Sequence, residues 1–155
     1  MMLQSISRAL QECGEKIAVA ESVTGGGIQS VLSAGENALR FFEGGIVAYT
    51  MEQKIRHLNI DKEEAEQCNC VSDGIALQMA KGVACLFHTE WGIGITGYAS
   101  PVPELNIFQL FAWIAFAYKD NAVLVRKIHA PGLPPGEEVR NFYIKELLGL
   151  FNKQL

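Results

Sequence analysis

Apolar residues along the chain form five short runs that predict buried strands. Each run is rich in β-branched, aromatic or small apolar residues. The runs occupy residues 17–21, 45–50, 91–96, 107–118 and 122–130. The longest run, 107–118, predicts a central strand, whereas glycine alternates with isoleucine in 91–96. Because glycine has no side chain, that alternation indicates a strand that another part of the molecule approaches closely.

The segments between these runs carry helix signals. Apolar residues at helical spacing predict helices over residues 3–13, 28–32, 75–86 and 139–151. N-capping patterns predict three further helix starts, at Thr50 with Gln53, at Asp61 with Glu64, and at Ser72. The helix that follows Thr50 carries Lys54 in its first turn. Gly14 and Gly35 predict where the first two helices of the chain end.

Strands interleaved with helices predict an α/β fold. We expect a three-layer α/β/α sandwich, in which helices cover both faces of a mixed, largely parallel sheet. The chain has 155 residues, a length that fits one domain over residues 1–155 with a sizeable core.

Composition and charge narrow the classes of function. Lys and Arg number 13 against 17 Asp and Glu, so the formal net charge is −4. This argues against general nucleic-acid binding, which needs a surplus of cations. The longest apolar run is well short of the ~20 residues of a membrane-spanning helix, so no membrane association is expected. Four irregularly spaced cysteines and an N-terminus without an apolar leader predict a reduced, cytoplasmic protein. Cys68 and Cys70 lack the second pair of a zinc site, so no metal is expected.

The strongest candidate for chemistry is the segment after the first predicted strand. Ser22, Thr24, Gly25 and Gly26 lie between this strand and the next predicted helix. In open α/β sheets ligands bind at the carboxyl ends of strands, and a helix N-terminus there offers N–H groups to an anion. The alternative is that Thr24 is an ordinary N-cap and that the glycines form a tight turn.

Two further strand ends carry residues that can meet this segment at the same sheet edge. Tyr49 ends the second predicted strand, and Lys54 begins the next helix. A lysine near a serine hydroxyl acts as a general base where burial or a neighbouring cation lowers its pKa. Thr96 and Gly97 follow the third strand, and Arg140 in the last helix is placed to reach a phosphate group. The alternatives are a solvated surface lysine and a solvated helix arginine.

Several segments, taken together and in order, resemble a known family. The similar segments, with the family's pattern after each, are AESVTGG at 20–26 (AES-x-TGG), GGIVAYTMEQKIRHLNI at 44–60 (G-x-V-x-Y-(S/T)-N-E-x-K-x-x-x-L-G-V), Val71–Ser72 (AVS), ITGYA at 95–99 (TG-x-AGP), and APG at 130–132 with Val139–Arg140 (FPGDR…IR). The chain thus resembles the C-terminal domain of the CinA competence/damage-inducible family over nearly its whole length. The shared order is more specific than any single segment.

Stand-alone members of that family are nicotinamide mononucleotide deamidases, so the resemblance implies an amidohydrolase. Water would replace the carboxamide nitrogen of nicotinamide mononucleotide, giving nicotinic acid mononucleotide and ammonia. By the resemblance Ser22 would be the nucleophile, and Lys54 with Tyr49 would activate it or hold the substrate. The other implied roles are pocket-shaping N–H groups at Thr24, Gly25 and Gly26, an opposite wall at Thr96 and Gly97, and a phosphate partner in Arg140. The implied partner is a small pyridine nucleotide, and no metal or organic cofactor is implied.

The chain also departs from the family's pattern. The family follows its TG-x-AGP with a longer glycine-rich loop and a KPVGTV strand entry, whereas residues 100–110 here contain neither glycine nor lysine. Residues 133–136 replace the family's GDR, and Met51 and Cys68–Cys70 stand where it has Asn and His-Gly-Ala. These departures support an alternative: the chain is a catalytically impaired member of the family, and its function is to bind a nucleotide or a protein partner. A homo-oligomer is compatible with either function.

Overall fold

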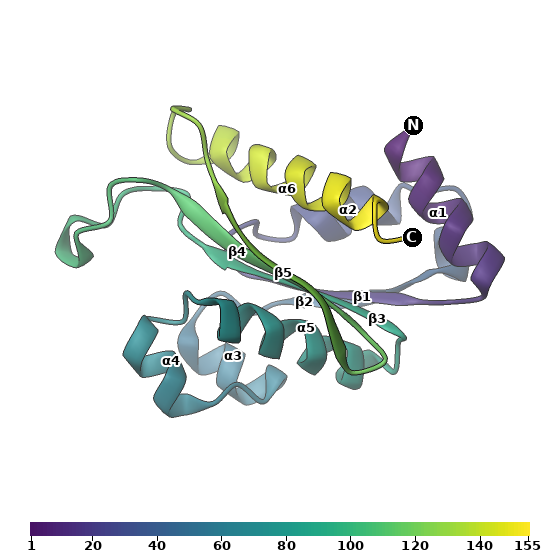
Figure 1. The fold of residues 1–155 in the computed structure, drawn as a ribbon, viewed down its shortest axis with the longest axis horizontal. Helices are drawn as coiled ribbons and strands as arrows, with labels where there is room; N and C mark the ends of the chain where they lie inside the picture. Colours follow the sequence, from purple (N-terminus) through teal and green to yellow (C-terminus); the bar gives the residue numbers. More distant parts are fainter.

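A five-stranded mixed sheet divides the molecule into three layers, as a computed structural model of all 155 residues shows (Figure 1). Its strands are β1 (Ile17–Glu21), β2 (Phe42–Val47), β3 (Trp91–Gly97), β4 (Phe111–Tyr118) and β5 (Asn121–His129). They lie in the order β2-β1-β3-β4-β5. β1 pairs in parallel with both β2 and β3, whereas β3–β4 and β4–β5 are antiparallel. The expected α/β fold with a mixed sheet is confirmed, with parallel pairing confined to the β2-β1-β3 half.

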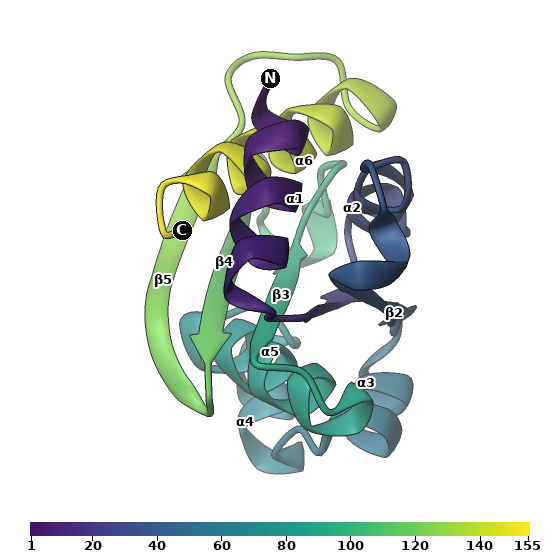
Figure 2. The same cartoon turned by 90° about the vertical axis from the view of Figure 1, so that its right-hand side faces the viewer.

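Helices cover both faces of the sheet, as the three-layer prediction requires. One face carries α1 (Met2–Cys13), α2 (Gly27–Ser33) and α6 (Glu137–Asn152). The other carries α3 (Met51–Leu58), α4 (Lys62–Cys68) and α5 (Asp73–Phe87). Figure 2, turned by 90°, shows the same two groups, with α1, α2 and α6 in the upper part of the view and α3, α4 and α5 in the lower part. Short 3-10 helices occur at η1 (Ala38–Arg40) and η2 (Pro103–Leu105). None of the α-helices combines the length and apolar character of a membrane span.

Local capping chemistry fixes where three helices begin. The side chains of Thr50, Asp61 and Ser72 accept hydrogen bonds from backbone N–H groups three residues later, which confirms all three predicted starts. Gly14 ends α1 in the left-handed conformation, with φ 67°, as predicted.

Two predicted strands have different bounds in the structure. β2 occupies Phe42–Val47 rather than 45–50. The N–H of Ala48 donates one hydrogen bond to the carbonyl of Glu21, and the chain then leaves the sheet because Thr50 is the N-cap of α3. β4 begins only at Phe111, because residues 98–110 leave the sheet as an excursion that contains η2. The predicted strand at 107–118 is interior, since β4 pairs with both β3 and β5, although β3 has the middle position of the sheet.

The two faces of the sheet are packed differently. On the α6 face, large side chains such as Phe116, Tyr143 and Phe151 are fully buried in one core cluster. On the α5 face, a Cβ at Gly92 or Gly94 would collide with backbone atoms of α5. The close approach predicted from the Gly–Ile alternation is therefore that of a helix backbone.

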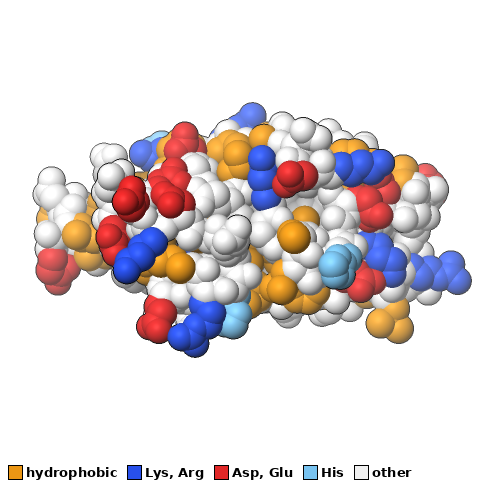
Figure 3. Space-filling model, turned by 90° about the horizontal axis from the view of Figure 1, so that it is seen from below, with side chains coloured by type: hydrophobic (Ala, Val, Ile, Leu, Met, Phe, Trp, Pro, Cys, Tyr) orange, Lys and Arg blue, Asp and Glu red, His pale blue; other side chains and the backbone are white.

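The outer face of α3, α4 and α5 is a solvated surface. Figure 3 views the molecule from this side and shows acidic and basic side chains interspersed, with small apolar patches between them. Such a mixture is typical of the exposed sides of amphipathic helices.

Candidate functional site

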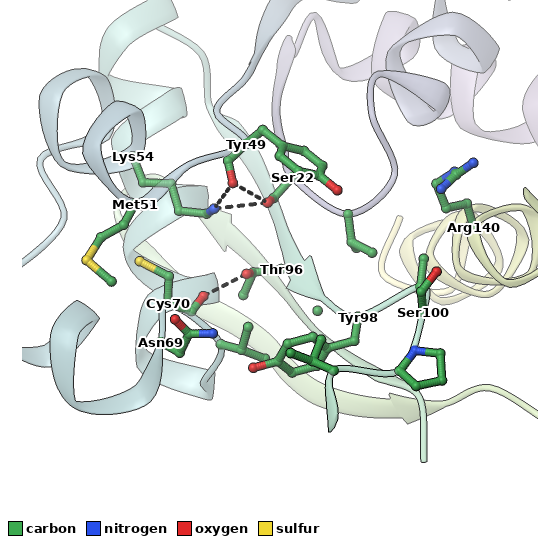
Figure 4. Close-up of a pocket in the computed structure, with 16 residues that line it drawn as sticks. Ser22, Tyr49, Met51, Lys54, Asn69, Cys70, Thr96, Tyr98, Ser100 and Arg140 are labelled. Carbon is green, nitrogen blue, oxygen red and sulfur yellow. Dashed lines mark hydrogen bonds between the residues drawn. The ribbon is translucent and has the colours of Figure 1, made fainter. Parts of the chain in front are cut away.

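The structure brings the side chains of Ser22 and Lys54 together at the carboxyl end of β1. Lys54 Nζ lies 2.9 Å from Ser22 Oγ and 2.9 Å from the backbone carbonyl oxygen of Tyr49. Both side chains are buried, with relative exposures of 6% for Ser22 and 3% for Lys54. Figure 4 shows the two side chains pointing toward each other across the gap between β1 and α3.

Local sequence explains why these two groups meet. Ser22 directly follows β1, whose five residues are all buried, so its position is fixed by the sheet. Thr50 caps α3, which places Lys54 and Leu58, one turn apart, on the buried side of that short helix. The Tyr49 carbonyl precedes the cap and receives one ammonium hydrogen. Strand end, cap and helix together orient the amine.

Burial is the main electrostatic influence on Lys54. It lowers the pKa of Lys54 below the usual 10.5, and the nearby Cys70 thiol opposes that shift to a lesser extent. Burial also raises the pKa of the Cys70 thiol. No Asp or Glu lines the cavity beside Lys54, so no carboxylate compensates its charge. A neutral amine within hydrogen-bond distance of a serine hydroxyl can accept that hydroxyl's proton.

Ser22 and Lys54 form one end of a cavity of about 370 Å³ that is open to solvent. Its lining residues are Ser22, Val23, Tyr49, Met51, Lys54, Asn69, Cys70, Val71, Thr96, Gly97, Tyr98, Ala99, Ser100, Pro101, Val102 and Arg140. Arg140, on α6, lies on the opposite side of the cavity from Lys54 (Figure 4). The segment that departs most from the family's pattern thus supplies part of the wall, through Ser100 and Pro101.

Three further residues predicted for the site line the cavity: Tyr49, Thr96 and Gly97. Each also has a contact that supports the fold. Tyr49 is 68% exposed, and its backbone carbonyl rather than its phenol accepts the hydrogen bond from Lys54. The Thr96 hydroxyl donates to the carbonyl of Cys70 at 2.7 Å, which ties β3 to the segment after α4. A Cβ at Gly97 would collide with the backbone of β4, so the glycine is required by strand packing.

Thr24, Gly25 and Gly26 do not line the cavity. The buried carboxylate of Glu21 occupies the N-terminus of α2, so the N–H groups of Ile28 and Gln29 are not available to a ligand. Glu21 accepts hydrogen bonds from the N–H groups of Ile28 and Gln29, both at 2.9 Å, and from the Thr24 hydroxyl at 2.6 Å. The N-cap residue of α2 is Gly26 at φ 103°, so Thr24 is not an ordinary N-cap either.

Glu21 and the segment after α4 were not among the residues predicted from the sequence to form the site. An acid at the end of a fully buried strand is an unusual position, and that signal was available in the sequence. Asn69 and Cys70 both have left-handed backbone conformations, with φ 53° and 60°, which bring them to the cavity beside Lys54. No spacing pattern in the sequence indicates this contact. Nowhere in the structure do three or more His, Cys, Asp or Glu side chains gather as metal ligands would.

Comparison with known proteins finds the same family in each case. The family model of the CinA C-terminal domain matches residues 1–155. A CinA-like protein of Thermosynechococcus vestitus is 34% identical over 151 residues, which cover 97% of this chain and 36% of that protein. A CinA-like protein of Synechocystis is 44% identical over 96 residues, or 62% of this chain and 23% of that protein. The chain therefore spans about a third or less of the length of these relatives.

Solved structures have the same fold. A CinA superfamily protein of Escherichia coli superposes with a TM-score of 0.90 at 25% identity, covering 99% of this chain and 88% of that one. A competence or damage-inducible protein of Enterobacter asburiae gives a TM-score of 0.92 at 23% identity, covering 99% and 95%. The second likeness concerns the fold alone.

Proposed function

We propose, from the premise that this chain belongs to the CinA C-terminal domain family, that it hydrolyses the carboxamide of nicotinamide mononucleotide. The observation that carries the proposal is the 2.9 Å contact between Lys54 Nζ and Ser22 Oγ at one end of an open cavity. A serine beside a buried amine is the arrangement that nucleophilic hydrolysis of an amide needs. The products would be nicotinic acid mononucleotide and ammonia.

The first half of the reaction transfers the acyl group to the enzyme. The neutral amine of Lys54 accepts the Ser22 proton as Oγ attacks the carboxamide carbon, and a tetrahedral intermediate forms. When Lys54 is neutral, the hydrogen bond that it donates to the Tyr49 carbonyl would leave its lone pair free to face Ser22. As the C–N bond breaks, the Lys54 ammonium gives its proton to the leaving nitrogen, which departs as ammonia. An ester with Ser22 remains.

The second half releases the acid. Lys54, neutral again, accepts a proton from a water molecule that attacks the ester carbon. The bond to Ser22 Oγ then breaks, and Oγ recovers a proton from Lys54. Nicotinic acid mononucleotide leaves, and the enzyme returns to its starting state.

The charge of the cavity suits an anionic substrate. Lys54 and Arg140 are its cationic side chains, and it contains no Asp or Glu. Arg140 is across the cavity from Lys54, so it would pair with the phosphate while the carboxamide lies at Ser22 (Figure 4). The substrate would thus span the cavity from one cation to the other.

The test is the release of ammonia from nicotinamide mononucleotide by the purified protein. We expect turnover by the wild type and a loss of at least ~10³-fold in Ser22→Ala, because the nucleophile is missing. Ser33→Ala is a matched control, since Ser33 is exposed on α2 and contacts only that helix. A wild type that releases no ammonia, or a Ser22→Ala variant that equals it, would contradict the proposal.

A second candidate is nucleotide binding without hydrolysis. It is favoured by one observation, that the glycine-free segment with Ser100 and Pro101 lies directly on the cavity. Calorimetry with a panel of nucleotides separates the two candidates. Binding without ammonia release supports this one, and no binding at all would favour a role in contacting a protein.

A further inference from the structure

Tyr143 is a buried phenol that the proposed reaction does not use. It lies on α6 three residues after Arg140 and has no exposed surface. Its hydroxyl donates a hydrogen bond of 2.7 Å to the backbone carbonyl of Tyr98. Tyr98 belongs to residues 97–102, which form one wall of the cavity. Burial raises the pKa of Tyr143, so the phenol remains a neutral donor throughout the neutral range.

A second hydrogen bond joins the same helix to the next residue of the wall. The N–H of Gly136, the N-cap residue of α6, donates to the carbonyl of Ala99 at 2.8 Å. Two successive carbonyls of the wall are therefore held by the first two turns of α6. On its other side the wall is held by β4, because the Tyr98 N–H donates to the carbonyl of Phe111 at 2.9 Å.

The helix that holds the wall is also the helix that carries Arg140 into the cavity. Arg140 lies between the two points of attachment in the sequence, Gly136 and Tyr143. A shift of α6 relative to the wall would change the distance between Arg140 and residues 97–102, all of which line the cavity. The hydrogen bond from Tyr143 restrains that shift.

We propose that Tyr143 is a positioning residue that sets the distance between Arg140 and the cavity wall, and so governs substrate binding rather than the chemical step. Ser22 and Lys54 are held by β1 and α3, and neither is hydrogen-bonded to Tyr143. Loss of the Tyr143 hydroxyl should therefore leave the reacting groups in place. The kinetic part of this inference rests on the proposed function, and its structural part rests on the hydrogen bonds alone.

The experiment compares Tyr143→Phe with Tyr118→Phe. Both remove one hydroxyl from a tyrosine and keep the ring. The Tyr118 hydroxyl bonds Glu15, and Tyr118 pairs with Trp91 at the opposite end of the sheet from Gly97. Kinetics with nicotinamide mononucleotide and amide hydrogen exchange are measured on both variants and the wild type.

In Tyr143→Phe we expect KM to rise by about tenfold with kcat changed by less than about twofold, as loss of one hydrogen bond implies. We also expect the amides of Tyr98 and Gly136 to exchange about tenfold faster. Tyr118→Phe should leave KM and both exchange rates unchanged.

Unchanged exchange at Tyr98 and Gly136 in Tyr143→Phe would overturn the inference, whatever the activity. A loss of kcat at constant KM would overturn it as well. If the wild type released no ammonia, the proposed function would fail, and the exchange rates would still decide whether Tyr143 holds the wall.

Discussion

The two ends of the cavity are built in different ways. At the Ser22–Lys54 end, both side chains are buried and come from β1 and α3, and their polar atoms bond each other and the Tyr49 carbonyl. At the other end, Ser100 and Pro101 are exposed on an excursion from the sheet that α6 hydrogen-bonds at the backbone carbonyls of Tyr98 and Ala99. Ser22 and Lys54 belong to segments that match the family's pattern, whereas Ser100 and Pro101 belong to the segment that departs from it most. Under the proposed function, reactivity would depend on regular secondary structure, and substrate choice would depend on the segment that leaves the sheet.

The strongest way to break this contrast is to remove the amine at the buried end. In Lys54→Met we expect amidase activity to fall by at least ~10³-fold, because no base remains for Ser22. We expect the melting temperature to rise by about 2 °C, since a buried cation without a carboxylate partner is replaced by an apolar side chain. Lys62→Met, at an exposed position, is the control for both measurements. A lower melting temperature in Lys54→Met would show that Lys54 serves the fold rather than the chemistry.

The next largest effect, a loss of stability, is expected at Glu21. Glu21 is the last residue of β1, and its carboxylate contacts the N-terminus of α2. In Glu21→Gln the amide nitrogen meets the N–H of Gln29 or of Ile28, so one buried donor loses its acceptor. Urea unfolding should show a decrease of about 2 kcal/mol in the free energy of unfolding. Glu43→Gln, which removes an exposed ion pair with Lys16, should cost less than about 1 kcal/mol. Equal effects of the two substitutions would mean that the Glu21 hydrogen bonds contribute little.

The lowered pKa of Lys54 predicts a pH dependence for both activity and stability. Only the neutral amine accepts the Ser22 proton, so kcat/KM should rise about tenfold per pH unit below that pKa and level off above it, before pH 10.5. Between the lowered pKa and 10.5 the unfolded chain binds the proton and the folded protein does not. The Lys54 contribution to stability therefore increases with pH across that interval and is lost as the pH falls. A rate profile that is flat up to pH 10 would rule out Lys54 as the base.

The smallest expected change is at the exposed end of the cavity. Arg140→Gln should raise KM for nicotinamide mononucleotide by about tenfold and leave kcat nearly unchanged, because it removes one charged contact to a phosphate. Arg126→Gln, on the exposed strand β5, is the matched control and should change neither constant. A fall in kcat in Arg140→Gln would place Arg140 at the reacting group and remove the distinction between the two ends.

Much of the fold could be predicted because its signals are local. The caps at Thr50, Asp61 and Ser72 involve residues three positions apart, and each was confirmed. The start of β4 could not be predicted, because residues 107–110 have strand-forming composition, yet Ile107 pairs with Val102 in an isolated bridge outside the sheet. Ser22 and Lys54 could be identified from the sequence, whereas Glu21 could be recognised only as an unusual acid in a buried strand, and its two hydrogen bonds to the N-terminus of α2 could not be predicted.

The sequence by itself determined which segments become helices and strands and which reactive groups stand at the strand ends. These properties depend on residues within about one helical turn or a few strand positions of each other. Only the tertiary structure decided that Lys54 is desolvated, that Cys70 lies beside it and that Tyr143 holds the far wall. Burial and backbone contacts of this kind require segments tens of residues apart to pack together, and no local pattern specifies how closely they approach.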